Sequence, residues 1–338
     1  MTEIERREQV HLDSGAPRGM REHLPTQNVA LPGEPAPLEA TDSTLEAGLE
    51  VEARSHWAYA RRRFLRHRLA MVSLIILIVI LGAGFMADAV APYAYDEIDL
   101  DNLAAAPTTT DKHYFGTDQL GRDYFSRVLF GIETSARVAF IVAILSTIIG
   151  TAIGAFAGYF GGWVDNALMR TTDLFLTLPG LAVLLVASAF FGQGNPYRVA
   201  VILALLFWTT LARIVRGTFL SLREKEYVEA AKAAGGSDFR IMLRHILPNA
   251  LGPIIVNATL TIAAAILVEA ALSFLGFGVQ PPTPALGKLI ADGQSEMLTA
   301  WWLVTMPGLT IVAIVLCVNF VGDGLRDALD PTQRRIRA

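Results

Sequence analysis

The sequence predicts an all-α membrane protein with six transmembrane helices. Hydrophobic residues make up 53% of the chain and charged residues only 18%, a low share for a soluble domain. The apolar residues gather in long runs, several of which reach the roughly 20 residues that a helix needs to cross a bilayer. Short alternating segments, which a closed β-barrel would require, are absent. Continuous runs predict helices because a helix satisfies its own backbone hydrogen bonds in lipid.

The N-terminal residues 1–60 are predicted to be a disordered cytoplasmic tail, since residues 1–55 are polar and carry few large apolar side chains. A basic segment and the first span follow over residues 61–91. The arginines that precede this span are Arg61, Arg62, Arg63, Arg66 and Arg68. The first apolar run starts near Leu69, too late for a cleavable signal peptide, so we expect it to stay in the mature protein.

Six apolar runs define the predicted spans and their direction. They cover residues 69–91, 136–157, 174–191, 199–214, 251–275 and 302–321. With the N-terminus inside, 22 of the 28 Lys and Arg residues fall in inside segments. Basic residues favour the cytoplasmic side, so both termini are predicted to be cytoplasmic in a multi-pass protein of the bacterial plasma (inner) membrane. Residues 92–133 then form one long extracytoplasmic loop, and residues 328–338 a cytoplasmic C-terminal tail.

Four glycines recur at intervals of four residues along the second span and its inner end: Gly150, Gly154, Gly158 and Gly162. This spacing places positions without side chains on one face of a helix, where a second backbone can approach closely. Tight helix packing is the predicted use. A glycine hinge for gating is the alternative.

The cytoplasmic loop 222–248, between spans four and five, is long, charged and helix-prone. A helix is predicted over residues 226–234 and ends at Gly235 and Gly236. Ser237 or Asp238 can cap a second helix. In that helix an apolar stripe is predicted, and Pro248 is expected to end it before span five. The stripe consists of Phe239, Met242, Leu243 and Ile246.

Small residues line the first helix of this loop, which suits insertion into a protein groove better than insertion among lipid headgroups, the alternative. The order is Glu229-Ala230-Ala231, three residues, Gly235, nine residues, and His245-Ile246-Leu247-Pro248. This pattern resembles the EAA loop of ABC import permeases, the membrane subunits of ATP-binding-cassette importers. The resemblance implies that Glu229 pairs with a basic group on an ATPase, that Ala230 and Ala231 allow a close fit, and that Gly235 forms the bend. His245 replaces an apolar residue of many other import families.

Further segments resemble the branch of this family that transports dipeptides, oligopeptides and nickel, and the likeness points to the C-type member of its permease pair. They are residues 113–131, 158–170, 273–287 and 322–331. The resemblance implies a type I ABC importer permease bundle with its core at residues 134–327. It also implies a second homologous permease subunit, two cytoplasmic ATPases and an extracytoplasmic substrate-binding protein. It leaves open whether peptides, nickel chelates or other small molecules are carried.

We do not expect this chain to catalyse a reaction. A phosphate-binding loop is missing, because Gly287-Lys288 is followed by Leu289 and the upstream glycine position is Pro282. ATP and Mg would therefore be bound by the partner ATPases. No catalytic constellation, cofactor site or basic stripe for nucleic acid is apparent, and the single cysteine, Cys317, excludes an intrachain disulfide.

Four external residues have no metal-ligand spacing and are predicted to be ordinary surface loop residues: Asp88, Asp111, His113 and Asp118.

Polar residues inside the spans are the candidates for lining a translocation pathway, because such residues are costly in lipid. Asn257 and Glu269 in span five are the first of these, and Asn319 lies in span six. The alternative is an interhelical hydrogen bond that fixes packing. An ion-coupled secondary transporter is a less favoured function, since the internal repeat expected of that class is not visible. A membrane enzyme or receptor would need a catalytic set or sensor domain.

Overall fold

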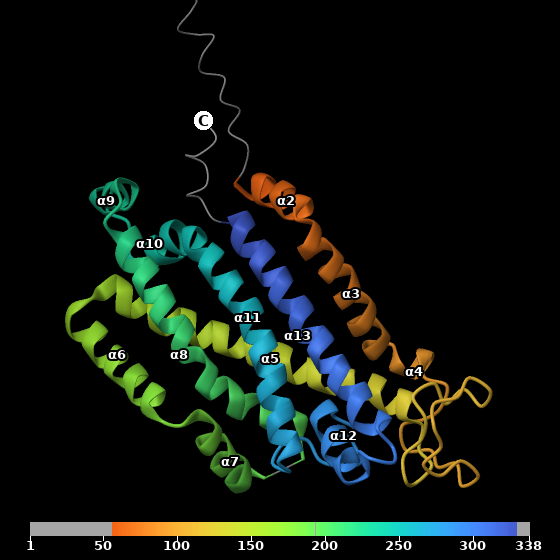
Figure 1. Ribbon diagram of the computed structural model, residues 1–338. Coiled ribbons are helices and arrows are strands. Elements are labelled where there is room, and N and C mark those ends of the chain that lie inside the picture. The colour runs from red at the N-terminus through yellow and green to blue at the C-terminus, as the bar shows by residue number, and fades with distance from the viewer. Residues whose placement is uncertain (1–55, 193, 330–338) are drawn as a thin grey trace, which may run out of the picture. The chain divides into compact units, whose positions relative to one another are not determined.

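The computed structural model describes residues 56–192 and 194–329, and within these ranges the chain is helical without a β-sheet. The predicted all-α fold class is confirmed. Isolated bridges join Thr117 to Asp123 and Gly194 to Val279. The elements, labelled as in Figure 1, are α2 (His56–Arg66), α3 (Arg68–Phe85), α4 (Ala87–Val90), α5 (Tyr124–Phe160), α6 (Gly162–Thr177), α7 (Gly180–Phe191), α8 (Pro196–Arg223), α9 (Glu226–Ala233), α10 (Asp238–Ile241), the π-helix η1 (Met242–Ile246), α11 (Leu247–Phe274), α12 (Leu286–Gly293), the 3-10 helix η2 (Gln294–Glu296) and α13 (Trp302–Leu329).

Five helical stretches are long and apolar enough to cross a membrane: α3, α5, α8, the continuous stretch from α10 through α11, and α13. The pair α6 and α7 makes a sixth span only if the two are taken together, because they are bent by 88°. The predicted third span, residues 174–191, is therefore wrong as one straight helix. The break falls at Leu178, whose ψ of 138° is extended, directly before Pro179. A residue that precedes proline is driven out of the helical region by a clash with the proline ring.

The most extensive helix pair in the described chain is α5 with α8. Three of the four spaced glycines lie where these helices meet. A Cβ atom at Gly150, Gly154 or Gly158 would stand 2.7, 2.4 or 2.6 Å from a carbonyl oxygen of α8. Those oxygens belong to Trp208, Ala212 and Arg216. Any side chain at the three glycines would push the two backbones apart, so close packing is what these positions provide.

Gly162 does not belong to that face. Helix α5 ends at Phe160, and Gly161 follows with φ of 66° as its C-cap. Gly162 has φ of 52° and begins α6, and nothing lies within 4 Å of a Cβ built on it. Its prediction as a fourth packing glycine is wrong, because two consecutive glycines with positive φ turn the chain away from the α5 axis.

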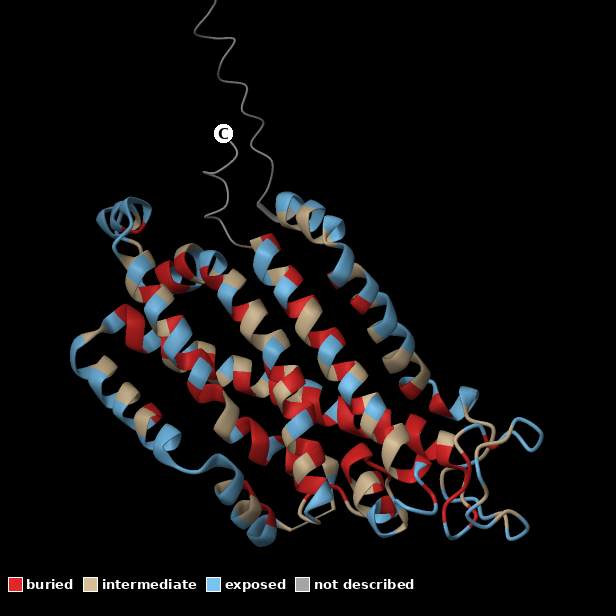
Figure 2. Cartoon of the chain, viewed as in Figure 1, coloured by how far each residue is buried: buried red, intermediate tan, exposed pale blue. Residues whose placement is uncertain are grey.

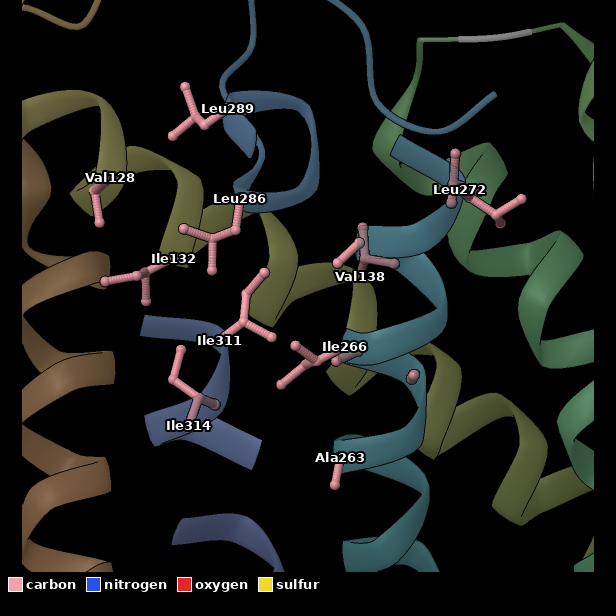
Figure 3. Packing of buried hydrophobic residues seen from close by; sticks show 14 of the residues in the cluster. Val128, Ile132, Val138, Ala263, Ile266, Leu272, Leu286, Leu289, Ile311 and Ile314 are labelled. Carbon is pink, nitrogen blue, oxygen red and sulfur yellow. The ribbon is translucent and has the colours of Figure 1, made fainter. Parts of the chain in front are cut away.

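The main hydrophobic core lies between α5, α8, α11, α12 and α13. Figure 3 shows side chains from four of these helices pointing toward one another. Figure 2 shows the complementary pattern, since the outer faces of α3, α6 and α7 are largely exposed. The labelled residues of Figure 3 are Val128, Ile132, Val138, Ala263, Ile266, Leu272, Leu286, Leu289, Ile311 and Ile314.

The bundle has two distinct ends. In Figure 1 the start of α2, the end of α13 and α9 lie at one end, here the α9 end, whereas α4, α7 and α12 lie at the opposite, α12 end. The loop 92–123 is at the α12 end with α4 and the start of α5. The connections 92–123 and 222–248 are therefore at opposite ends of the bundle.

Several segment boundaries differ from those expected. Residues 1–55 lie outside the described residues, but residues 56–60 are helical in α2 rather than part of a tail. Helix α5 begins at Tyr124, so the loop that was expected to reach residue 133 ends at Asp123. At the other end, α13 continues through Leu329, about two turns beyond the predicted span, which ended at residue 321, and residues 330–338 lie outside the described ranges.

Candidate functional site

The candidate site is the connection between α8 and α11 at the α9 end. Helix α9 starts after Lys225 with acidic residues, Glu226 and Glu229, in its first turn and has Lys232 in its last, an order that complements the helix dipole. Val228 is fully buried against the bundle. Glu229 and Ala230 are exposed, and Figure 2 shows α9 as mostly exposed surface. One face therefore anchors the helix and the remainder is free for contact.

The bend after α9 is closed by two backbone hydrogen bonds. Gly235 donates to the carbonyl of Lys232 at 2.9 Å, and Gly236 donates to that of Ala231 at 3.0 Å. This is the Schellman arrangement, which requires a left-handed residue after the helix. Gly235 has φ of 78° and supplies it. The helix end predicted here is present, and it satisfies the carbonyls of Ala231 and Lys232.

The second helix does not stop at Pro248. Residues 238–274 form one continuous run in which the π-helix η1 leads directly into α11, and Pro248 lies in the first turn of α11. A proline is tolerated there, and the wider turn of a π-helix just before it relieves the ring clash that a regular helix would suffer. The expected break before span five is therefore wrong. His245 ends up half-buried in η1 with its carbonyl accepting from Asn249 at 2.7 Å.

The predicted apolar stripe of this helix is half wrong. Met242 and Ile246 are buried, but Phe239 and Leu243 are 63% and 48% exposed. Ile241 is buried in their place, because the π-helical turn shifts the phase of the buried face. Phe239 and Leu243 thus form an exposed apolar surface close in sequence to Ala230 and the bend. Such exposed apolar surface is available for contact with lipid or with another chain.

The loop is held to the bundle by polar contacts as well as by apolar ones. Arg223, the last residue of α8, donates to the carbonyl of Tyr159 at 2.8 Å. The Tyr159 hydroxyl donates to the Asp238 carboxylate at 2.6 Å. Lys232 of α9 lies 5.6 Å from the centre of the Tyr159 ring. These three contacts join the end of α5 to both sides of the bend, and they link residues too distant in sequence to be read from its local pattern.

Glu269, predicted as a pathway residue, lies in the core and is fully buried. Its carboxyl oxygens accept from Ser135 of α5 at 2.8 Å and from Ser273 of α11 at 2.7 Å. This geometry matches the alternative, an interhelical hydrogen bond, and leaves Glu269 facing no open space within the chain. Asn257 is half-buried on α11, and its carbonyl accepts from Thr261 at 2.9 Å. Its place on a pathway stays a prediction.

The loop at the α12 end contains a buried polar network where surface residues were expected. His113 is 1% exposed, and its Nδ1 lies 2.8 Å from the Asp123 carboxylate. The Asp123 side chain also accepts from the amide of Ser126 at 2.7 Å and so caps α5. Tyr93 stacks on the His113 ring with centres 4.7 Å apart. The surface prediction is wrong for His113, because it closes the loop onto the start of α5.

Asp118 is also buried rather than exposed. Burial acts to raise the pKa of its carboxyl, but the Arg122 backbone amide and guanidinium and the charge of Arg127 outweigh it, so the pKa lies below 3.8. Arg122 Nη2 lies 2.7 Å from the carboxylate, and Arg127 contacts the same oxygen. Within the part of the chain that the structure describes, no cluster of three or more His, Cys, Asp or Glu could hold a metal ion.

Comparison with protein families assigns most of the chain. The family of binding-protein-dependent transport system inner membrane components matches residues 150–335. The N-terminal transmembrane domain of oligopeptide transport permease C matches residues 55–107.

Individual relatives agree with these matches. The chain is 45% identical over 286 residues to the oligopeptide transport system permease protein OppC of Escherichia coli K12, covering 85% of this chain and 94% of that protein. It is 42% identical over 277 residues to the protein of the same name from Mycobacterium tuberculosis H37Rv, covering 82% and 94%. A crystal form of the inward-facing MetNI methionine ABC transporter matches in fold with a TM-score of 0.50 and 19% identity, over 61% of this chain and 97% of that chain.

Proposed function

The chain belongs to the family of binding-protein-dependent transport system inner membrane components, and we propose that it is a pore-forming permease subunit of an ATP-driven oligopeptide importer. Relatives that share 42–45% of its residues over more than four-fifths of its length are named as oligopeptide permeases. That identity and coverage favour peptides over the nickel chelates that the sequence resemblance left open. The family match also counts against the ion-coupled secondary transporter, which the sequence already made the less favoured function.

The loop 222–248 is proposed to dock on a cytoplasmic ATPase subunit. Glu229 and Ala230 are exposed, Gly235 forms the bend, and Phe239 and Leu243 present apolar surface that the bundle does not cover. The single observation that carries this proposal is that Glu229, Ala230 and Gly235 of the EAA pattern are exposed on this bent pair of helices. Glu229 would pair with a basic group of the ATPase, and Ala230 would allow close approach. Ala231, predicted to share this role, instead packs partly against the bundle.

The remaining partners follow from the same mechanism. Closure of two ATPases on ATP would move the docked loops and switch the spans between inward- and outward-facing states as rigid bodies. A second permease would complete the pore, and an external binding protein would deliver the peptide. ATP and Mg would stay on the ATPases. The placement of both termini in the cytoplasm is supported by the 22 of 28 basic residues on that side in this orientation.

A charge reversal in the complete complex tests the docking role. Glu229→Lys should abolish peptide uptake and uptake-coupled ATP hydrolysis while the chain still inserts and the permease pair still forms. The matched control is Asp101→Lys, which reverses an exposed charge in the loop at the opposite end of the bundle. Normal coupled transport by Glu229→Lys would refute docking through this loop.

Uptake by the intact complex, measured with peptides of increasing length and with nickel chelates, tests the substrate. Saturable uptake of oligopeptides is expected. Uptake of chelates without peptides would overturn the substrate assignment while leaving the docking role standing.

A further inference from the structure

Tyr159 occupies the point where the docking loop meets the transmembrane bundle. It is the penultimate residue of α5 and is buried in a second apolar cluster, separate from the main core. That cluster combines residues of α5 and α8 with residues from every helical element of the loop. They include Leu211, Val215, Phe219, Val228, Ile241, Met242 and Ile246. The ring of Tyr159 therefore lies where the loop packs against α5 and α8. The loop and these helices must move together if the loop drives the spans.

Three directed contacts at Tyr159 reach three different segments. Its hydroxyl donates to Asp238, the first residue of α10, at 2.6 Å. Its carbonyl accepts from Arg223 at the end of α8 at 2.8 Å. Its ring lies beneath the ammonium group of Lys232 in α9, 5.6 Å away. Of the three, only the hydroxyl contact can be removed by a substitution that keeps the ring.

The helix that carries Tyr159 cannot slide freely past its neighbour. Gly154 and Gly158 bring the α5 backbone against α8 with no room for a methyl group. Helix α8 is tied in turn to α6 by a bidentate ion pair between Arg216 and Asp165. A displacement received at Tyr159 would therefore reach α5, α8 and α6 as one body, because packed interfaces of this kind resist continuous deformation.

We infer that Tyr159 is a positioning residue that transmits movement of loop 222–248 to α5 through its hydrogen bond to Asp238. The inference rests on the proposed function. It identifies Tyr159 as the residue through which movement of the ATPase would reach the bundle. The hydrogen bond is charge-assisted, which makes it stronger than a neutral one. Loss of this bond should uncouple ATP hydrolysis from import without breaking the assembly.

The test uses the complete reconstituted complex and measures peptide imported per ATP hydrolysed. Tyr159→Phe keeps the ring, its packing and the contact with Lys232 but removes the hydroxyl. ATP hydrolysis should continue while import per ATP falls about tenfold, the factor that corresponds to about 1.4 kcal/mol. Tyr197→Phe, which removes an exposed hydroxyl at the other end of the bundle, should leave the ratio unchanged.

The partner residue provides an independent arm. Asp238→Ala should reproduce the loss seen with Tyr159→Phe, and Asp238→Asn should restore much of the ratio because its amide oxygen still accepts the hydrogen bond. The double variant Tyr159→Phe with Asp238→Ala should be no worse than either single variant. A purely structural role would instead lower thermal stability and ATP hydrolysis together.

Three results would overturn the inference: an unchanged ratio in Tyr159→Phe, losses that multiply in the double variant, or parallel loss of stability and hydrolysis. If Tyr159→Phe failed to assemble, the two Asp238 variants would decide the question by the same ratio. Failure of the wild-type complex to import peptide would instead count against the proposed function, so the two failures are distinguishable.

Discussion

Substitution of Gly154 by alanine tests the close packing of α5 on α8. The new Cβ would lie 2.4 Å from the Ala212 carbonyl oxygen and 2.8 Å from the Val215 Cβ. Ordinary contact begins at 3.4 Å, so the oxygen is about 1 Å too close. Because the obstacle is backbone inside a helix, it cannot rotate away, and the two helices must separate.

The cost follows from two opposing contributions. Forcing a methyl group into a well-packed site costs about 1–3 kcal/mol, and contact with backbone points to the upper end. Alanine has a better helix propensity than glycine by about 1 kcal/mol, which offsets part of this cost. The net destabilisation is therefore about 2 kcal/mol, close to a 30-fold change in the folding equilibrium.

Thermal unfolding of the purified complex measures the effect, with Gly217→Ala as the matched control. Gly217 is in α8, and nothing lies within 4 Å of a Cβ built there. The control should be neutral or slightly stabilising, so the two alanine variants should differ in sign. Equal unfolding temperatures for both variants would refute the close-packing argument.

The remaining predictions concern three separate places. Gly235→Val should weaken ATPase binding, because φ of 78° costs a β-branched residue at least about 1–2 kcal/mol. Gly235→Asn should bind the ATPase nearly normally. Equal ATPase binding by the two variants would contradict this prediction. Glu269→Gln should leave uptake intact, while Glu269→Leu should lower thermal stability by about 1–3 kcal/mol, because it removes the acceptor for two buried serine hydroxyl hydrogens. Lost uptake at unchanged stability in Glu269→Gln would restore the pathway hypothesis. The Asp118 carboxyl, with its lowered pKa, contributes stability that is present above 3.8 and is lost as pH falls through the lowered value. The amides of Leu120 and Arg122, which donate to Asp118, should lose hydrogen-exchange protection in that acidic range. Asp118→Asn should abolish this pH-dependent loss of protection. A loss that persisted in Asp118→Asn would show that another group causes it.

The presence of a membrane-spanning helix could be predicted from a long apolar run. Its boundaries were predicted less well where a local capping or proline signal competed with that run. The start of α5 lies twelve residues before the predicted span at 136, yet the signal was present: Asp123 precedes the helix and caps it through Ser126. Leu178-Pro179 was a second such signal, since hydropathy alone carried the predicted third span across a proline.

Other features depend on contacts between distant parts of the chain and have no local signature. The exposure of Phe239 and Leu243 follows from a π-helical turn that sequence periodicity at 3.6 residues does not anticipate. The burial of His113 requires Asp123 and Tyr93, which only the folded loop brings to it. The role of Tyr159 could not be predicted from local sequence, because its partner Asp238 is 79 residues away.

The two hydrogen bonds that seal the end of α9 make its shape a property of this chain alone. A docking element already set before its partner arrives avoids the ordering entropy of about 1–2 kcal/mol per residue that a flexible loop would lose on association. Its affinity is then governed by the outward side chains. Exchanging α9 and its glycine bend as a unit between related permeases should therefore transfer the preference for a particular ATPase without redesign of the bundle.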